Sequence, residues 1–227
     1  MRSTNRIVFD IETLGLPLES FDEQQQAYLT KFASTPEEMT EAIQKLNLSP
    51  FTARIIAVGM VNPESNQGKV LYQGKDKERT FTEDGTVELV SCSEHDVLTG
   101  FWETIAHYGQ FITFNGRTFD CPFLMLRSAM LGIRPSKNLM PYRYSAAEHC
   151  DLMDQLTFYG AFRKYNLDFY CKGFGIKSPK SEGITGLDLG PLFQQGKFRE
   201  IAEYCLGDVR ATTELYHRWE NLLAFER

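Results

Sequence analysis

Two carboxylates stand two residues apart near the start of the chain, directly after an apolar run. The run is Ile7-Val8-Phe9, and Asp10 and Glu12 follow it with one apolar residue between them. Side chains alternate along a β-strand, so we expect Asp10 and Glu12 to project from the same face. Two ionised carboxylates on a largely buried strand repel each other and lose hydration, so they require a neighbouring cation or must bind a proton. A divalent metal ion would supply that positive charge.

Such pairs also arise by chance in an acidic chain. The 227 residues include 30 acids, and roughly four acid-x-acid pairs are expected in a random order, which is the false-positive risk of a short motif. Asp10 and Glu12 therefore need support from other parts of the sequence.

A third acid, Asp120, follows a short apolar segment and a loop. Residues 111–114 are expected to form a buried strand and residues 115–118 the loop after it. Asp120 then lies beyond the carboxyl end of a strand, where ligand sites of open α/β sheets are found. It could instead be only the N-cap of the helix that begins before Cys121-Pro122.

A fourth acid, Asp208, lies in a predicted helix at the end of the chain. Tyr204 precedes it by four residues, so the two side chains share one helix face. The same face carries Ile201, Ala211, Thr212 and Leu215. An acid on an apolar stripe suggests a site, although a buried Tyr-Asp hydrogen bond would also explain the pair.

Together these segments resemble the DEDD superfamily of 3′-to-5′ exonucleases, which has a ribonuclease H-like fold. Asp10 and Glu12 match the first acidic motif of that superfamily. Asp120 matches the second motif and Asp208 the third. Tyr204 matches the tyrosine (DEDDy) branch.

The end of the chain is also similar to predicted exonucleases related to the proofreading domain of family B DNA polymerases. The similar stretches are Gly183-Ile184-Thr185-Gly186, Gly196-Lys197 and residues 201–218. The histidine branch would have a histidine five residues before the last acid, where this chain has Glu203.

The resemblance implies a two-metal-ion mechanism with Mg²⁺ or Mn²⁺, in which two ions about 4 Å apart activate water and stabilise the leaving oxygen. Asp10 would bridge both ions. Glu12 and Asp208 would hold the ion that activates water, and Asp120 would support the second ion. Tyr204 would orient the water, because a phenol with a pKa near 10 is a poor general base at pH 7.

Further residues are candidates for contacts with nucleic acid. By resemblance, Thr13 and Leu14 would touch the terminal nucleotide, and Asn115 would lie near the scissile phosphate. Phe119 could stack on a base or belong to the core. Tyr142 and Arg143, with Tyr144 after them, combine aromatic rings with a cation, as surfaces for single strands do.

Length and composition indicate a single domain over residues 1–227, with a helical insertion at about 17–50. The resemblance implies that this domain is a 3′-5′ exonuclease domain. We expect no membrane span, since no stretch approaches roughly 20 apolar residues. The five cysteines contain no Cys-x-x-Cys pair, which favours a reduced, cytoplasmic protein without a zinc site. The run His149-Cys150-Asp151 lacks a fourth ligand, so we interpret it as structural.

Charge is unevenly distributed along the chain. The net charge of −6 argues against a broad basic surface, but residues 127–180 hold nine basic residues against four acidic ones. A basic region beside an acidic centre could hold a phosphate backbone, although an ordinary solvated surface also explains the imbalance.

The elements that must position the site form an α/β fold, with a mixed central sheet of about five strands flanked by helices. Strands are predicted at residues 6–12, 54–61, 69–72 and 111–114. Helices are predicted at residues 21–32, 36–46, 93–108, 120–130, 152–160, 168–174 and 197–223. Because a helix connects them, the strand at 111–114 should run parallel to the first strand, and the strands at 54–61 and 69–72 should be antiparallel.

The sequence therefore predicts a metal-dependent 3′-5′ exonuclease that releases nucleoside 5′-monophosphates from the 3′ end of single-stranded nucleic acid, with DNA favoured. Alternatives are an RNA-trimming exoribonuclease and a nucleic-acid-binding module without catalysis. A structural calcium domain is disfavoured, because no Asp-rich loop of the EF-hand type is present. Protein partners are not predicted.

Overall fold

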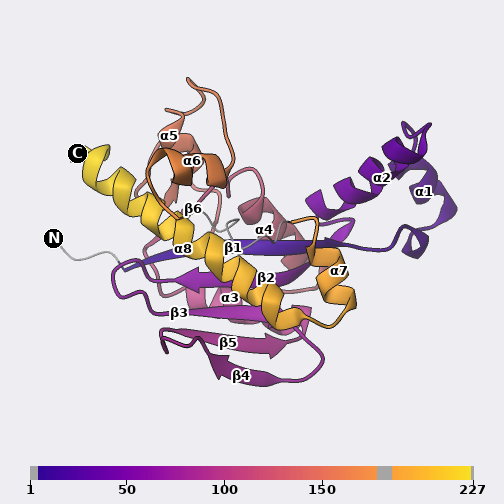
Figure 1. Ribbon diagram of the computed structural model, residues 1–227, viewed down its shortest axis with the longest axis horizontal. Helices are drawn as coiled ribbons and strands as arrows, with labels where there is room; N and C mark the ends of the chain where they lie inside the picture. Colours follow the sequence, from indigo (N-terminus) through magenta and orange to yellow (C-terminus); the bar gives the residue numbers. More distant parts are fainter. Residues whose placement is uncertain (1–4, 178–185, 226–227) are drawn as a thin grey trace.

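A computed structural model describes residues 5–177 and 186–225. Figure 1 shows a central sheet with the long helix α8 (Phe198–Leu222) crossing one face. Helices α3 (Glu94–Ile105) and α4 (Asp120–Met130) cover the other face. The stretch 183–185, which contributed to the family resemblance, and most of the loop expected at 177–186 lie outside the described residues.

In the described part of the chain, seven strands form one mixed sheet in the order β4-β5-β3-β2-β1-β6-β7. The strands are β1 (Arg6–Gly15), β2 (Ala53–Val61), β3 (Gly68–Gln73), β4 (Glu78–Phe81), β5 (Val87–Cys92), β6 (Gln110–Thr113) and β7 (His149–Asp151). β6 runs parallel to β1 and β3 antiparallel to β2, as expected. The predicted ribonuclease H-like α/β class is confirmed, but the expected number of about five strands was too low.

The strands that the sequence did not reveal are β4, β5 and β7. β4 is an edge strand with mostly exposed side chains, so it lacks an apolar period. β5 does alternate, with Val87, Leu89 and Ser91 buried, and this period of two was an available signal. β7 has three residues, which is too short for any periodic pattern.

Helices α1 (Glu23–Leu29) and α2 (Pro36–Lys45) lie between β1 and β2, and they project away from the sheet in Figure 1. Capping boxes at Asp22 and Thr35 start them, and neither helix contains a buried residue. Short 3₁₀ turns flank them at Leu18–Ser20 and Leu46–Leu48. The division of the chain into one domain with an insertion stays a prediction.

Short helices complete the described structure. They are α5 (Leu152–Leu156), α6 (Leu167–Gly173) and α7 (Leu189–Gln194), of which α7 was not predicted. No helix in the described ranges is both long and apolar enough to cross a membrane.

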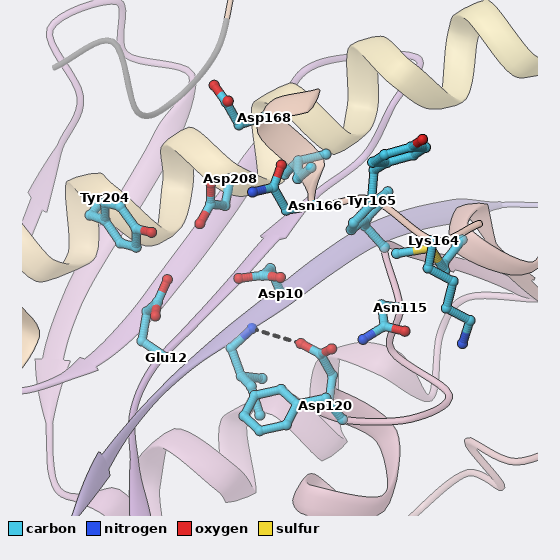
Figure 2. Close-up of a pocket in the computed structure, with 15 residues that line it drawn as sticks. Asp10, Glu12, Asn115, Asp120, Lys164, Tyr165, Asn166, Asp168, Tyr204 and Asp208 are labelled. Carbon is cyan, nitrogen blue, oxygen red and sulfur yellow. Dashed lines mark hydrogen bonds between the residues drawn. The ribbon is translucent and has the colours of Figure 1, made fainter. Parts of the chain in front are cut away.

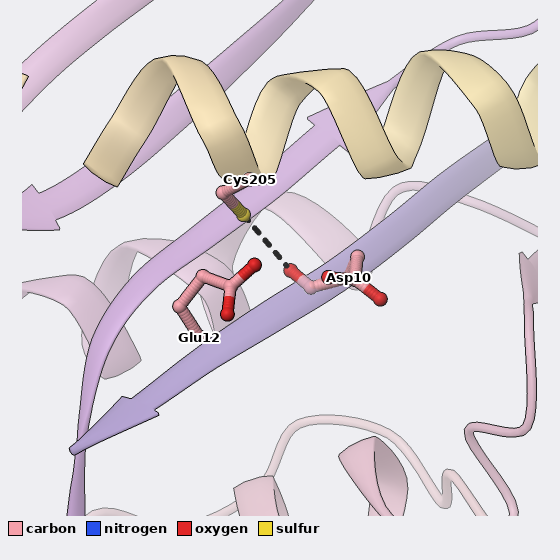
Figure 3. Close-up of side chains that lie close together, drawn as sticks. All are labelled: Asp10, Glu12 and Cys205. Carbon is pink, nitrogen blue, oxygen red and sulfur yellow. Dashed lines mark hydrogen bonds between the residues drawn. The ribbon is translucent and has the colours of Figure 1, made fainter. Parts of the chain in front are cut away.

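The core lies in two layers, one on each face of the sheet, and β1 contributes to both. Ile7, Phe9 and Ile11 pack in the layer with α3 and α4. Val8 packs in the layer beneath α8. Because side chains alternate, Asp10 and Glu12 share one face of β1, as the sequence predicted, and the structure shows that this face is turned towards α8 (Figure 3).

Candidate active site

Strand β1 and helix α8 meet closely at the acidic pair. Opposite Asp10 on β2 stands Gly59, and a Cβ atom there would lie 2.8 Å from Val209 Cγ2 and 3.1 Å from Cys205 Sγ, both on α8. The missing side chain therefore lets α8 approach the sheet. This approach brings Tyr204 and Asp208 over Asp10 and Glu12.

Asp120 reaches the same place from the other side of β1. The pairing of β1 with β6 ends at Val8 and Ile112, which leaves the next backbone amides of β1 without a strand partner on that edge. The Asp120 carboxylate accepts a hydrogen bond of 3.1 Å from the backbone N–H of Ile11. Phe119 occupies the N-cap position and Asp120 is the first residue of α4. The alternative prediction, that Asp120 is only the N-cap of this helix, is therefore wrong.

These side chains line one cavity of about 530 Å³ (Figure 2). The predicted residues in its lining are Asp10, Glu12, Asn115, Phe119, Asp120, Tyr204 and Asp208. The structure thus brings together all four acids and the tyrosine. The lining also includes residues that sequence reasoning missed, namely Ile11, Phe114, Met153 and the continuous segment Lys164, Tyr165, Asn166, Leu167 and Asp168.

The carboxylates hold protons more tightly than usual because they are buried together. Burial, followed by the charges of Asp120, Glu12 and Asp208, raises the pKa of Asp10 well above its ordinary value. Burial and the charge of Asp208 raise the pKa of Glu12 in the same way. The pKa of Asp120 rises to about 7, mainly through burial, although the hydrogen bond from Ile11 opposes the rise.

Tyr204 keeps its proton in this environment. Burial raises the pKa of its phenol, and the negative charge of Asp208 and a side-chain hydrogen bond to Asp208 act in the same direction. The hydroxyl group is therefore a neutral hydrogen-bond donor and acceptor across the physiological pH range. This agrees with an orienting role and not with that of a base.

Cys205 projects from α8 towards Asp10 and Glu12, and its position tests which metal the site would suit (Figure 3). Ligand atoms of Asp10, Glu12 and Cys205 lie within 4.8 Å of one another. The Cys205 thiol is fully buried, contacts the carbonyl oxygen of Asp10 at 3.7 Å, and has a pKa well above its usual value because of burial. A protonated thiol is a poor ligand, so the available donors are carboxylate oxygens, which fit a hard divalent cation such as Mg²⁺ or Mn²⁺.

The loop that carries Asn115 is fixed by a buried acid that the sequence reading treated as structural. Asp151, at the end of β7, accepts hydrogen bonds of 2.9 Å from the backbone N–H groups of Asn115, Arg117 and Met153. These bonds hold Asn115 in the left-handed conformation, with a φ of 63°. Asp151 therefore positions the cavity wall without lining it.

His149 is also structural. Its ring Nε2 lies 2.8 Å from the Thr113 hydroxyl, and the ring packs against Phe111. Burial and the charge of Arg117 lower the pKa of His149 to about 3, so the ring is neutral.

Four predicted nucleic-acid contacts lie outside the cavity lining. Thr13 is buried and donates to the Asn47 carbonyl at 2.8 Å, and Leu14 packs against the core beneath α8. Tyr142 is exposed, with its ring 5.8 Å from that of Tyr144.

Arg143 is held in a structural ion pair. Its guanidinium group contacts the buried Asp154 carboxylate through two hydrogen bonds of 2.8 Å and 2.5 Å. Asp154 also lies 3.8 Å from Arg117, so it anchors the segment before β7 to the loop after β6. This ion pair was not foreseen, because the sequence separation of eleven residues crosses an irregular segment.

Comparison with known proteins decides the family. Residues 48–224, more than three quarters of the chain, match the family described as predicted 3′-5′ exonucleases related to the exonuclease domain of PolB. The chain belongs to this family. Asp120, Tyr204 and Asp208 lie within the matched residues, whereas Asp10 and Glu12 precede them. The predicted family resemblance and the 3′-5′ exonuclease class are confirmed, and assignment to the tyrosine branch stays a prediction.

Archaeal DNA polymerases are among the similar proteins. DNA polymerase 1 of Sulfurisphaera ohwakuensis is 24% identical over 157 residues, which cover 62% of this chain and 18% of the polymerase. DNA polymerase 1 of Saccharolobus solfataricus is 25% identical over 164 residues, covering 66% of this chain and 17% of the polymerase. DNA polymerase 1 of Sulfolobus acidocaldarius is 25% identical over 177 residues, which cover 71% of this chain and 19% of the polymerase. The chain thus spans less than a fifth of the length of these curated relatives.

Proposed function

We propose that this PolB-related exonuclease hydrolyses the last phosphodiester bond at the 3′ end of single-stranded nucleic acid and releases a nucleoside 5′-monophosphate. The observation that carries the proposal is the convergence of four carboxylates, from β1, α4 and α8, on one cavity. DNA is favoured over RNA because the similar polymerases are named for DNA.

The four acids Asp10, Glu12, Asp120 and Asp208 would hold two divalent ions, Mg²⁺ or Mn²⁺. When bound, such ions supply the positive charge that makes water nucleophilic near neutral pH and stabilises the leaving oxygen. Their charge would also relieve the repulsion that raises the carboxylate pKa values.

The chain's own residues would orient the reactants. The protonated Tyr204 hydroxyl group would hold the attacking water by a hydrogen bond. Asn115, fixed by Asp151, offers an amide group to the phosphate from the opposite wall. Phe119 lines the cavity beside Asp120, and its ring centroid lies 5.5 Å from that of Phe123. One side of the Phe119 ring thus packs in the core, and the side in the cavity would contact the terminal base.

The four predicted nucleic-acid contacts outside the cavity lining would act in other ways. Thr13 and Leu14 would meet the terminal nucleotide through backbone atoms, because the Thr13 hydroxyl group already donates to Asn47. Tyr142 would offer its exposed ring to a single strand. Arg143 would act mainly by holding this segment in place through Asp154.

A cytoplasmic location belongs to the same proposal. Its support is that all five cysteines are unpaired and buried.

The test is cleavage of a 5′-labelled single-stranded DNA and of the matching RNA, each with Mg²⁺ or Mn²⁺. The wild type should shorten the strand stepwise, and Asp10→Ala and Asp208→Ala should abolish the ladder. Asp76→Ala, at an exposed acid remote from the cavity, is the matched control and should cleave normally.

The same assay separates the alternatives. Faster shortening of the RNA would favour an exoribonuclease. Tight strand binding without cleavage at saturating metal would favour a binding module without catalysis. Cleavage without metal, or unchanged cleavage by both mutants, would contradict the proposal.

A further inference from the structure

An exposed segment of mixed basic and aromatic character borders the acidic cavity. It begins after α5 with Phe162 and Arg163, continues through Lys164, Tyr165 and Asn166, and we call these residues with Phe169 the basic-aromatic rim. Every residue from 160 to 166 is exposed. The middle of the rim, residues 164–166, lines the cavity (Figure 2). The rim is therefore continuous with the acidic site.

The two cations of the rim, Arg163 and Lys164, have no acidic partner among residues 5–177 and 186–225. In the described part of the chain, no carboxylate lies within ion-pair distance of Arg163 or Lys164. Arg143, in the same basic region, contrasts with them because Asp154 neutralises it. Exposed, unpaired cations at the border of a carboxylate cluster can attract phosphates that the cluster itself would repel.

Figure 2 shows that the Lys164 side chain extends on the side of the cavity where Asn115 lies. Its amine is thus directed away from Glu12 and Tyr204. A strand that reaches the acids past Asn115 would carry its backbone along this cation.

The aromatic side chains of the rim are ordered but still exposed. The rings of Tyr165 and Phe169 stack with centroids 4.2 Å apart and an interplanar angle of 11°. The Arg163 guanidinium lies 5.2 Å from the Tyr165 ring centroid. Phe162 and Phe169 are 67% and 56% exposed, so ring surface remains available to a ligand.

The geometry of the stack is fixed by a helix cap. Asn166 accepts a hydrogen bond of 2.9 Å from the backbone N–H of Phe169 and starts α6. Tyr165 and Phe169 are therefore held in register before any ligand binds. A preordered stack loses little conformational entropy when a base is added to it.

We propose that the basic-aromatic rim binds the nucleotides on the 5′ side of the scissile phosphate. In this arrangement Arg163 and Lys164 hold the strand backbone, and bases extend the stack of Tyr165 and Phe169. The occupant is a single strand, because stacking requires unpaired bases and because the rim leads directly into the cavity. The proposal rests on the proposed function, since it assigns the upstream part of the same substrate.

The experiment measures binding, so that it does not depend on turnover. Fluorescence anisotropy with 5′-fluorescein single-stranded DNAs of two to ten nucleotides, in Ca²⁺, gives the affinity of the whole chain at each length. Wild-type affinity should rise with length. Tyr165→Ala should weaken binding of the longer strands roughly 5- to 150-fold, the usual range for one base–aromatic stack.

Matched variants separate stacking from charge and from folding. Tyr165→Phe keeps the ring and should retain the wild-type affinity. A plot of log affinity against log salt concentration has a negative slope, and Lys164→Glu should make it less steep by at least ~0.7, the value for one phosphate contact on a single strand. Phe81→Ala, at an exposed aromatic residue on the edge strand β4, should leave binding unchanged. Circular dichroism checks folding, and Lys164→Glu carries the test if Tyr165→Ala does not fold.

The outcomes distinguish this proposal from the proposed function. If the wild type binds long strands and the rim variants lose that binding, the rim assignment holds even where no strand is cleaved. If Tyr165→Ala and Lys164→Glu bind all lengths like the wild type, the assignment is overturned, even where cleavage is normal. Concentration-dependent association of the wild type that Phe162→Ala abolishes, with strand binding unchanged, would show that the rim is a protein interface and would also overturn it.

Discussion

Asp120→Asn should stabilise the metal-free protein at pH 8. Burial and neighbouring charges raise the pKa of Asp120 from 3.8 to about 7, so the folded protein disfavours the ionised form. Keeping Asp120 ionised in the folded state at pH 8 therefore lowers the free energy of unfolding by up to about 4 kcal/mol, since each unit by which the pKa is raised corresponds to about 1.4 kcal/mol. An asparagine removes the charge but keeps an oxygen to accept from the Ile11 N–H. For a chain of this size, 4 kcal/mol corresponds to roughly 8–16 °C in Tm.

The Asp120 contribution to stability depends on pH, and its sign follows from the direction of the pKa shift. Because the folded pKa of Asp120 lies above the unfolded value, this contribution to stability is complete below pH 4 and is lost as the pH rises through 7. About 3 kcal/mol of the loss falls between pH 5 and pH 8, because the unfolded chain has already ionised by pH 5. The advantage of Asp120→Asn over the wild type should therefore be about 3 kcal/mol larger at pH 8 than at pH 5.

The assay is urea unfolding in EDTA at both pH values, followed by circular dichroism. Asp76→Asn is the matched control, because that acid is exposed and its substitution should change the free energy of unfolding by no more than about 0.5 kcal/mol at either pH. Added Mn²⁺ should stabilise the wild type more than Asp120→Asn. The reasoning is refuted if Asp120→Asn is no more stable than the wild type at pH 8, or if its advantage is the same at both pH values.

Three further substitutions test separate parts of the structure. Tyr204→Phe should lower kcat roughly 10- to 100-fold with little change in strand affinity, measured by steady-state kinetics, because one orienting hydrogen bond is lost. Gly59→Ala should lower the free energy of unfolding in urea by about 1–3 kcal/mol and reduce cleavage, because the added Cβ would lie 2.8 Å from Val209 Cγ2. Gly173→Ala is the control: its Cβ would have no neighbour within 4 Å, so its stability should be unchanged. The pKa of His149 is lowered to about 3, so the contribution of His149 to stability should be lost as the pH falls from 6.5 towards 3. The advantage of the wild type over His149→Gln should therefore narrow by up to about 3 kcal/mol between pH 7 and pH 4. Equal activity of Tyr204→Phe, equal stability of the two glycine variants, or a pH-independent advantage over His149→Gln would each contradict its prediction.

The acids were predictable because their positions follow from local periodicity. The strand period of two placed Asp10 and Glu12 on one face, and the helix period placed Tyr204 and Asp208 together. Asp120 could be placed by its position after a strand. The family resemblance then joined segments that lie far apart in sequence.

Other features of the site depend on tertiary contacts that no local pattern carries. The ion pair of Arg143 with Asp154 crosses an irregular segment, so the cation looked free in the sequence. The rim residues Lys164 and Tyr165 border the cavity only because α6 packs beside α8. Their mixture of cation and ring was nevertheless a readable signal, of the same kind as the one recognised at Tyr142.

The central claim is that the carboxylate cavity releases the terminal nucleotide as a 5′-monophosphate. Its most direct test is a single-stranded DNA with a radioactive phosphate between the last two nucleotides, incubated with Mn²⁺ and either wild-type protein or Asp10→Ala. We predict that the wild type releases the label on the terminal nucleoside 5′-monophosphate and that Asp10→Ala releases none. Label retained on a shortened strand, or equal release by Asp10→Ala, would contradict the claim.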